Sequence, residues 1–161
     1  MNLAVSYKLK QSISEEGQDI DVSIDKTVVM INISDELLFN TASYNVSSKA
    51  NNILKKLSEV IKSEPSMEVM VEGHTDSRTI NTPMVTDNWD LSVKRATSIV
   101  RKLQKEYGVD PSQLIASGRS SYLPLVENDS KENMAMNRRT KIIILPNLDK
   151  FFALLDAEDN L

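Results

Sequence analysis

The sequence feature that most constrains the fold is an apolar stripe between residues 46 and 61. Apolar residues recur there at i, i+4, i+7, i+8, i+11, i+14 and i+15: Val46, Ala50, Ile53, Leu54, Leu57, Val60 and Ile61. This spacing places all seven side chains on one side of a helix. We therefore predict a helix from Val46 to Ser63, capped by Asn45 or Ser47 and ended by Pro65.

Strand patterns flank this helix on both sides. Residues 19–33 alternate and then become rich in β-branched residues, which predicts a hairpin that turns at Asp25-Lys26. Further strands are predicted at 67–73, 114–118 and 140–145, and a second helix at 91–107 with Val93, Ala96, Val100, Leu103 and Tyr107 on its core side. Residues 34–44 and 119–136 are expected to be loops. The first loop carries an apolar plug at 37–39, and the second ends in a short helical turn.

The order of these elements favours an α+β fold. A hairpin comes first, and α, β, α, β and a final β follow. We predict a two-layer sandwich in which helices pack on one face of a mixed β-sheet, with short terminal helices. A chain of 161 residues fits one domain. We place that domain at 19–146, a leader or the end of a stalk at 1–18, and an amphipathic helix at 147–161.

Composition excludes several classes of function. The net charge of −4 and pI of about 5.1 argue against a nucleic-acid-binding surface. The chain has no cysteine, so disulfides, thiolate metal sites and cysteine nucleophiles are excluded. No apolar run approaches the roughly 18 residues that cross a bilayer, and no secretory signal is visible. Any membrane anchor would have to lie in a part of the gene product absent from this sequence.

The stretch from Glu72 to Ala96 carries the best candidate site. It places Asp76 just after a predicted strand and Arg95 on the helix that follows the next loop. An acid and a base so placed can face each other across a cleft and grip a ligand with an amine and a carboxylate. Spacing alone leaves a structural salt bridge between Asp76 and Arg95 equally open.

Catalysis is a weaker reading of the same stretch. His74 and Asp76 could serve a hydrolase, and Asp87 or Asp90 could join them around a metal. However, the chain has one histidine and neither a GxSxG elbow nor HExxH or DxDxDG spacing. A structural histidine and solvated or capping aspartates are the simpler interpretation. We predict no catalytic residue, no metal and no cofactor.

Several motifs together resemble a known family. They are GHTD at 73–76, NWDLSVKRA at 88–96 and NRR at 137–139, joined by GVDPSQLIASGRSSYLP. The chain resembles the OmpA-like peptidoglycan-binding domain (OmpA/MotB C-terminal domain type) from about Val28 to Leu145. The longer loop in NTPMVTDNWDLS is more similar to the MotB-like form. Thr79 and the segment Gly118-Arg119-Ser120 depart from the family's glycines, so the rim of the site is expected to differ, and Arg119 could add a contact.

The resemblance implies a non-catalytic module that binds the diaminopimelate of the peptidoglycan stem peptide. Asp76 would take the ligand's ammonium, Arg95 would take its carboxylate, and Asn88 would help to hold it. Thr75 and Leu91 would flank the pocket, and the arginines of NRR, Arg138 and Arg139, would lie near it.

The expected role is to anchor an outer-membrane or lipid-anchored protein to the wall, in the periplasm of a Gram-negative bacterium. One alternative is a stator-type anchor of a motor, and another is a peptidoglycan-processing or metal-dependent hydrolase that uses His74 and Asp76. A homodimer stays open. Contact with a membrane is expected only through the missing anchor.

Overall fold

A five-stranded sheet forms the centre of the molecule. The computed structural model describes residues 10–11, 20–25, 28–146, 149, 153 and 156–157. The strand order is β1-β2-β5-β3-β4. The strands are β1 (Ile20–Asp25), β2 (Val28–Ser34), β3 (Met67–His74), β4 (Leu114–Gly118) and β5 (Arg139–Pro146). The β3–β4 pair is parallel and the other pairs are antiparallel, so the sheet is mixed.

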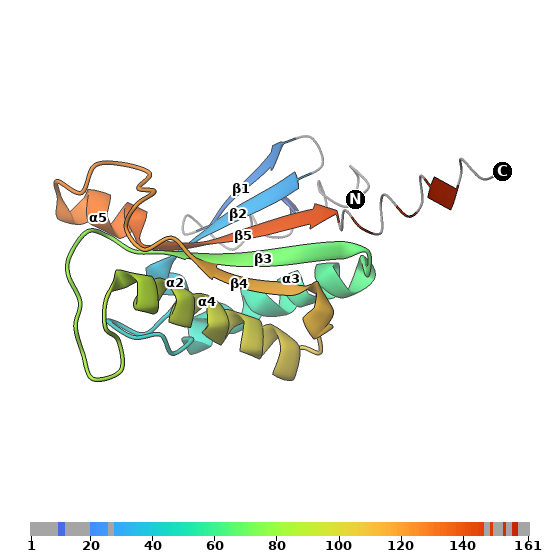
Figure 1. Ribbon diagram of the computed structural model, residues 1–161, viewed down its shortest axis with the longest axis horizontal. Helices are drawn as coiled ribbons and strands as arrows, with labels where there is room; N and C mark the ends of the chain where they lie inside the picture. The colour runs from blue at the N-terminus through green and yellow to red at the C-terminus, as the bar shows by residue number, and fades with distance from the viewer. Residues whose placement is uncertain are drawn as a thin grey trace.

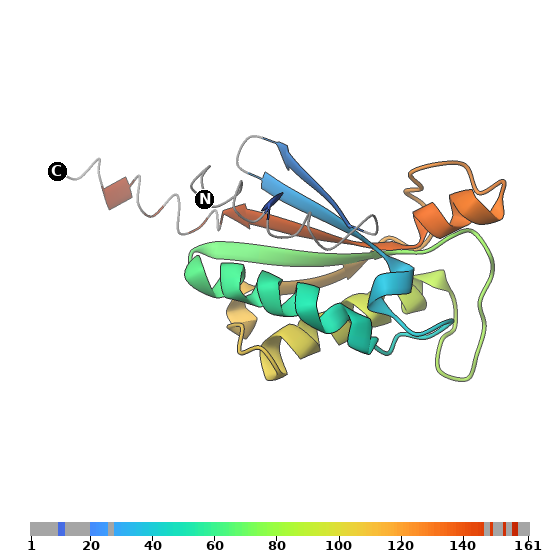
Figure 2. The same cartoon turned by 180° about the vertical axis from the view of Figure 1, so that it is seen from behind.

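Two long helices cover one face of this sheet (Figures 1 and 2). The helices are α2 (Asp35–Leu38), α3 (Asn51–Ser63), α4 (Asn88–Lys105) and α5 (Lys131–Asn137), with 3-10 turns η1 (Ser48–Ala50) and η2 (Pro111–Gln113). Helices α3 and α4 form the helical layer. The structure thus confirms the predicted α+β sandwich. Helices α2 and α5 and the long β3–α4 loop gather at one end of the sheet (Figure 1).

The hydrophobic core lies between the sheet and the two long helices. The α3 stripe is buried as predicted, with Ile53, Leu54, Leu57 and Ile61 at most 1% exposed. Opposite them lie the alternating apolar residues of the strands, namely Val29, Ile31, Ile33, Val69, Val71, Ile142 and Ile144. The two halves of the apolar pattern therefore meet in one core.

Two element boundaries differ from the predictions. Helix α3 begins at Asn51, after η1, and not at Val46. Ser47 does not cap it, because its Oγ donates to Leu37 O at 2.8 Å and its N donates to Leu38 O at 2.8 Å. The predicted 34–44 loop contains the short helix α2, whose cap is Ser34.

Helix α4 also starts earlier than predicted. Asp87 caps it by accepting a hydrogen bond from Asp90 N at 2.9 Å, so Asn88 and Asp90 lie in its first turn. Val93 was expected in the core but is 41% exposed, because the buried side of α4 is centred on Ser92 and Ala96.

The predicted leader at 1–18 and the predicted C-terminal helix at 147–161 lie mostly outside the described residues. Among the residues that are described, no helix has both the length and the apolar composition needed to cross a membrane.

Candidate ligand-binding site

Two glycines bring the start of α4 onto the ends of β3 and β4. Gly73 and Gly118 are paired in register in these parallel strands. A Cβ atom at Gly73 would lie 2.2 Å from Ser92 O, and one at Gly118 would lie 2.8 Å from Val93 N. Only glycine permits so close an approach of helix and strand. As a result, the side chains of the first two turns of α4 lie beside the residues that follow β3.

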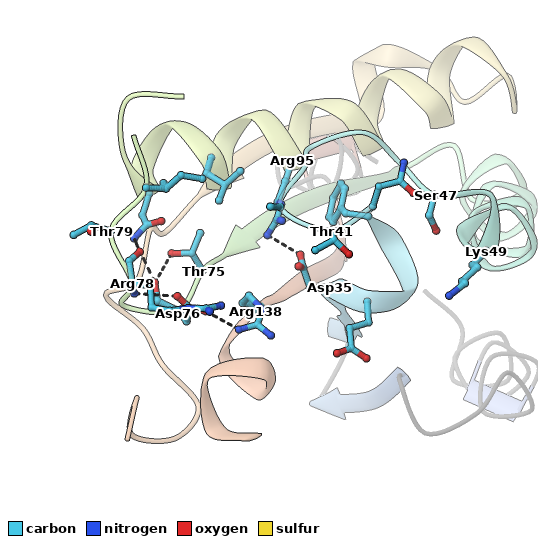
Figure 3. A pocket seen from close by; sticks show the side chains of 17 residues that line it. Asp35, Thr41, Ser47, Lys49, Thr75, Asp76, Arg78, Thr79, Arg95 and Arg138 are labelled. Carbon is cyan, nitrogen blue, oxygen red and sulfur yellow. Dashed lines mark hydrogen bonds and ion pairs between the residues drawn. The ribbon is translucent and has the colours of Figure 1, made fainter. Parts of the chain in front are cut away.

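A pocket of about 790 Å³ opens at this end of the molecule (Figure 3). Six of the seven predicted binding residues line it: Thr75, Asp76, Asn88, Leu91, Arg95 and Arg138. They come from the end of β3, the first turns of α4 and the start of β5. The seventh residue, Arg139, lines a smaller pocket of about 310 Å³ with residues of β1 and β2.

Asp76 forms the acidic centre of the main pocket. Its Oδ2 accepts hydrogen bonds from Arg78 Nη2 and Arg138 Nη1, both at 2.7 Å, and from Arg78 Nε at 3.0 Å. Its Oδ1 accepts from Arg78 N at 2.9 Å. Burial would raise the pKa of Asp76, but these hydrogen bonds outweigh burial and hold the pKa below its usual range. The carboxylate is therefore charged at neutral pH.

Arg95 forms the basic centre of the pocket, but it does not pair with Asp76. Its Nη1 lies 2.7 Å from Asp35 Oδ1, and its Nε donates to Ser43 O at 2.9 Å. The guanidinium also lies 5.0 Å from the ring centroid of Phe39. Burial raises the pKa of Asp35 although Arg95 and Arg138 oppose this effect. The simple salt bridge between Asp76 and Arg95 is thus not formed, and each charge has its own partner.

Arg138 stands between these two centres (Figure 3). It bonds Asp76 directly, and its charge acts on both Asp35 and Arg95. Its position is set by the neighbouring Asn137, which is fully buried. Asn137 accepts from Leu125 N and Val126 N and donates to Val126 O and Asn128 Oδ1, so it fastens the preceding loop.

The other predicted residues shape the pocket wall. Thr75 Oγ1 donates to Asp76 O at 2.9 Å, and Asn88 Nδ2 donates to Arg78 O at 2.9 Å and to Asp76 O at 3.4 Å. Asn88 therefore ties the start of α4 to the turn that carries Asp76. Leu91 is 7% exposed and provides an apolar wall.

We call Asp76, Arg78, Arg138, Arg95 and Asp35 the Asp76 cluster. A second group, the His74 cluster, consists of Glu72, His74, Arg119 and Arg139. His74 Nε2 lies 2.7 Å from Glu72 Oε1, and Arg119 Nε donates to Glu72 Oε2 at 3.3 Å. Burial and the charge of Arg139 lower the pKa of His74 although Glu72 opposes them.

The hydrolase arrangement expected as an alternative is not formed, because His74 is bonded to Glu72 while Asp76 is bonded to arginines. Within the described part of the chain, no three His, Asp or Glu side chains are grouped so that they could hold a metal ion.

Sequence reasoning missed three residues of this site. Asp35 lies in a segment read as a loop, Arg78 follows the GHTD motif in the long loop, and Asn137 was quoted only as part of NRR. Asp35 is placed beside Arg138 by the register of β2 with β5, which sequence spacing does not show: Ser34 pairs with Arg139, and Asp35 N donates to Arg138 O at 3.1 Å. No sequence signal marks Arg78 as a partner of Asp76.

Comparison with known proteins agrees with this fold. The model of the OmpA family matches residues 38–138. Motility protein B of Bacillus subtilis is 28% identical over 142 residues, covering 88% of this chain and 50% of that protein. Outer membrane protein Omp38 of Acinetobacter baumannii is 34% identical over 109 residues, covering 68% and 30%. The solved cell wall anchor of the T6SS from Pseudomonas aeruginosa has a TM-score of 0.77 and 29% identity, covering 88% and 96%.

The fold and the paired charges at the sheet end define a small non-catalytic binding module. The chain belongs to the OmpA family of peptidoglycan-binding domains. The resemblance to this family and to its MotB-like form, inferred from GHTD, NWDLSVKRA and NRR, is confirmed. The chain spans about half the length of the first curated relatives it matches.

Proposed function

We propose that this chain grips the diaminopimelate of a peptidoglycan stem peptide in the pocket of the Asp76 cluster. The observation that carries the proposal is the placement of a charged acid and a charged base on the same pocket, each held by a separate partner. The far end of diaminopimelate carries an ammonium and a carboxylate on one carbon, so it needs one anion and one cation at fixed separation. Asp76 would bind the ammonium, and Arg95 would bind the carboxylate.

In the absence of ligand, Arg78 would occupy the position on Asp76 that the ligand ammonium takes when it binds. Its guanidinium occupies Asp76 Oδ2, although its side chain is 62% exposed. Because the Arg78 side chain reaches Asp76 from the solvent side, a ligand ammonium could take its place on Oδ2 while Arg78 returns to water. Arg138 is only 23% exposed and would stay, bridging Asp76 to the ligand carboxylate.

Arg95 would remain in place when the ligand binds. Its Nη1 and Nε are fixed by Asp35 and Ser43, which leaves Nη2 to donate to a ligand carboxylate beside Arg138. A ligand without the carboxylate would leave Arg95 Nη2 without an acceptor, and a ligand without the ammonium would not replace Arg78 on Asp76. Each charge-assisted hydrogen bond left unmade in the pocket is costly. The pocket would therefore reject an ordinary peptide-bonded residue.

The wider role we propose is a periplasmic anchor between the wall and the outer membrane, formed by residues 19–146 of a longer protein. The similarity to Omp38, an outer membrane protein, supports this. A stator-type anchor of a motor is the second candidate, because Motility protein B of Bacillus subtilis aligns with 88% of the chain. The sequence upstream of residue 1 in the gene would decide, since the stator role requires a membrane helix there.

Retention on purified sacculi tests the binding proposal. Asp76→Ala and Arg95→Ala should each abolish retention, whereas His74→Gln, which alters only the His74 cluster, should be retained like the wild type. Circular dichroism checks that each variant is folded. Undiminished retention of folded Asp76→Ala and Arg95→Ala would contradict the proposed site.

A further inference from the structure

Two exposed aromatic rings lie near the pocket of the Asp76 cluster and do not line it. Trp89 lies in the first turn of α4, and Tyr122 lies in the loop after β4. Their ring centroids are 5.4 Å apart with a tilt of 38°, and the residues are 50% and 69% exposed. Val93, one helical turn beyond Trp89, is 41% exposed. Large apolar side chains that gather at the surface usually mark a binding site.

The backbone beneath the two rings is fixed. Ser92, which is fully buried, donates from its Oγ to Trp89 O at 2.9 Å and accepts from Ser120 N at 3.1 Å. Tyr122 N donates to Arg119 O at 3.2 Å. One side chain thus ties the first turn of α4 to the loop that carries Tyr122. The pair is built into the fold, so little ordering is required when a ligand binds.

The aromatic pair lies at the same end of the molecule as the pocket of the Asp76 cluster. Asn88, the residue before Trp89, lines that pocket. Thr75 N donates to Ser120 O at 3.0 Å, so the turn before Asp76 is bonded to the loop that leads to Tyr122. On α4, Asn88, Leu91 and Arg95 lie on the pocket flank, whereas Trp89 and Val93 lie on the flank toward β4, with the buried Ser92 and Ala96 between the two flanks. A polymer held in the pocket would reach the rings around the N-terminal end of α4.

We propose that Trp89 and Tyr122 receive a sugar ring of the glycan strand to which the bound stem peptide is attached. The proposal rests on the function proposed above. A pyranose ring presents C–H groups on its faces, and these carry slight positive charge that suits the negative face of an aromatic ring. Peptidoglycan joins each stem peptide to a strand of N-acetylated amino sugars, so a stem peptide in the pocket brings such a ring with it.

A protein partner fits this surface less well. Two aromatic side chains bury about 150–250 Å² each, whereas a stable protein interface needs about 800 Å² from each partner. A single sugar ring or a disaccharide is closer to the size of the pair. Its many hydroxyl groups also remain in water when one of its faces is stacked, so no buried polar group has to be satisfied.

Trp89 is the only tryptophan in the chain, so its fluorescence reports on this surface directly. Titration with a peptide-free oligomer of N-acetylglucosamine should give a saturable change in fluorescence. Tyr122→Ala should weaken this binding about fivefold, as expected from the loss of one aromatic contact. Met84→Ala, which truncates an exposed side chain on the β3–α4 loop, is the matched control and should bind like the wild type.

Asp76→Ala separates this proposal from the function proposed above. It should lose the stem tripeptide but keep the sugar-dependent change in fluorescence. A tripeptide joined to its disaccharide should bind wild type about fivefold tighter than the tripeptide alone, and Trp89→Ala should remove that gain.

Absence of a saturable change with the sugar oligomer would overturn the proposal. So would a wild type that binds both peptides equally, or a Trp89→Ala variant that keeps the gain. A fourth contradicting result is a Trp89→Ala variant that changes the oligomeric state in sedimentation and leaves sugar binding intact, because the rings would then serve an interface between copies of the chain.

Discussion

The Asp76 cluster and the His74 cluster lie two residues apart along the chain, and both contain charges of each sign. In the His74 cluster, Glu72 and His74 are 5% and 3% exposed and bond each other. In the Asp76 cluster, a charged carboxylate faces a pocket of about 790 Å³, and one of its arginines is largely exposed. Both clusters join a buried carboxylate to a largely exposed arginine, since the side chain of Arg119 is 54% exposed. The difference therefore teaches that a ligand site is marked by the pocket onto which the carboxylate opens, and not by buried charge or an exposed partner alone.

The largest expected effect comes from changing how α4 approaches the sheet. Gly73→Ala places a Cβ against Ser92 O, so α4 must move away from β3. Overpacking of this kind costs about 1–3 kcal/mol of unfolding free energy. The shift also separates Arg95 from Asp76, so we expect stem-peptide binding to be lost. Urea unfolding and calorimetric titration measure the two effects, and a variant that binds like the wild type would contradict the positioning role.

Asp35→Asn should affect stability and ligand response in opposite directions. It removes the anion beside the buried Arg95, and an unpaired buried charge is strongly destabilising. We expect about 2 kcal/mol lower stability without ligand, since the amide can still accept a hydrogen bond. A stem peptide should then raise Tm by more than in wild type, because its carboxylate supplies the missing anion.

Glu36→Gln, at a neighbouring residue of the same pocket, is the control for Asp35→Asn. Both the Tm without ligand and its increase on binding should stay near the wild-type values. If Asp35→Asn loses stability without a larger ligand response, the ligand carboxylate does not supply the anion that Arg95 has lost, and the proposed contact between them is contradicted.

Arg78→Ala should tighten binding, whereas Arg138→Ala should weaken it. Both arginines bond Asp76 Oδ2 at 2.7 Å, but Arg78 is much the more exposed of the two. Removing the exchangeable partner frees Asp76 for the ligand, with a gain in affinity of about two- to fivefold, the size expected for an exposed ion pair. Weakening by both variants alike would show that Arg78 contacts the ligand and does not stand in for it.

The smallest effect concerns pH and the His74 cluster. The pKa of His74 is lowered in the fold, so below about pH 6.5 the unfolded chain takes up a proton before the native state does. The contribution of His74 to stability is therefore present above pH 6.5 and falls as the pH drops toward its folded pKa. Urea unfolding at pH 7.5 and 5.5 should show this loss in wild type and a smaller loss in His74→Gln. An equal loss in both proteins would contradict it.

Much of the fold could be predicted because its pattern is local. The α3 stripe and the alternation in β3 each follow from spacing within one element, and each leads directly to buried side chains. The predicted start of α3 was wrong because Ser47 donates hydrogen bonds to Leu37 O and Leu38 O, which lie about ten residues earlier in the chain. The prediction that Val93 lies in the core was wrong because its burial depends on how α4 packs over Gly118.

Predictions about the site had a similar limit. Motifs identified six residues that the fold brings to one pocket, since family patterns summarise contacts that spacing cannot show. The ion-pair partners of Arg95 and Asp76 could not be predicted. Asp35 is placed by the register of β2 with β5, and Arg78 is placed by the course of the long loop. The position of Arg139 follows from strand alternation, which turns its side chain away from its neighbour Arg138.

The central claim is that the pocket recognises an ammonium and a carboxylate on one carbon. Calorimetric titration with two stem tripeptides tests it most directly, one ending in meso-diaminopimelate and the other in lysine, which keeps the ammonium but lacks the adjacent carboxylate. We predict that the lysine peptide binds at least about tenfold more weakly, the loss expected for one charge-assisted hydrogen bond to Arg95. Equal affinity for the two peptides would contradict the account.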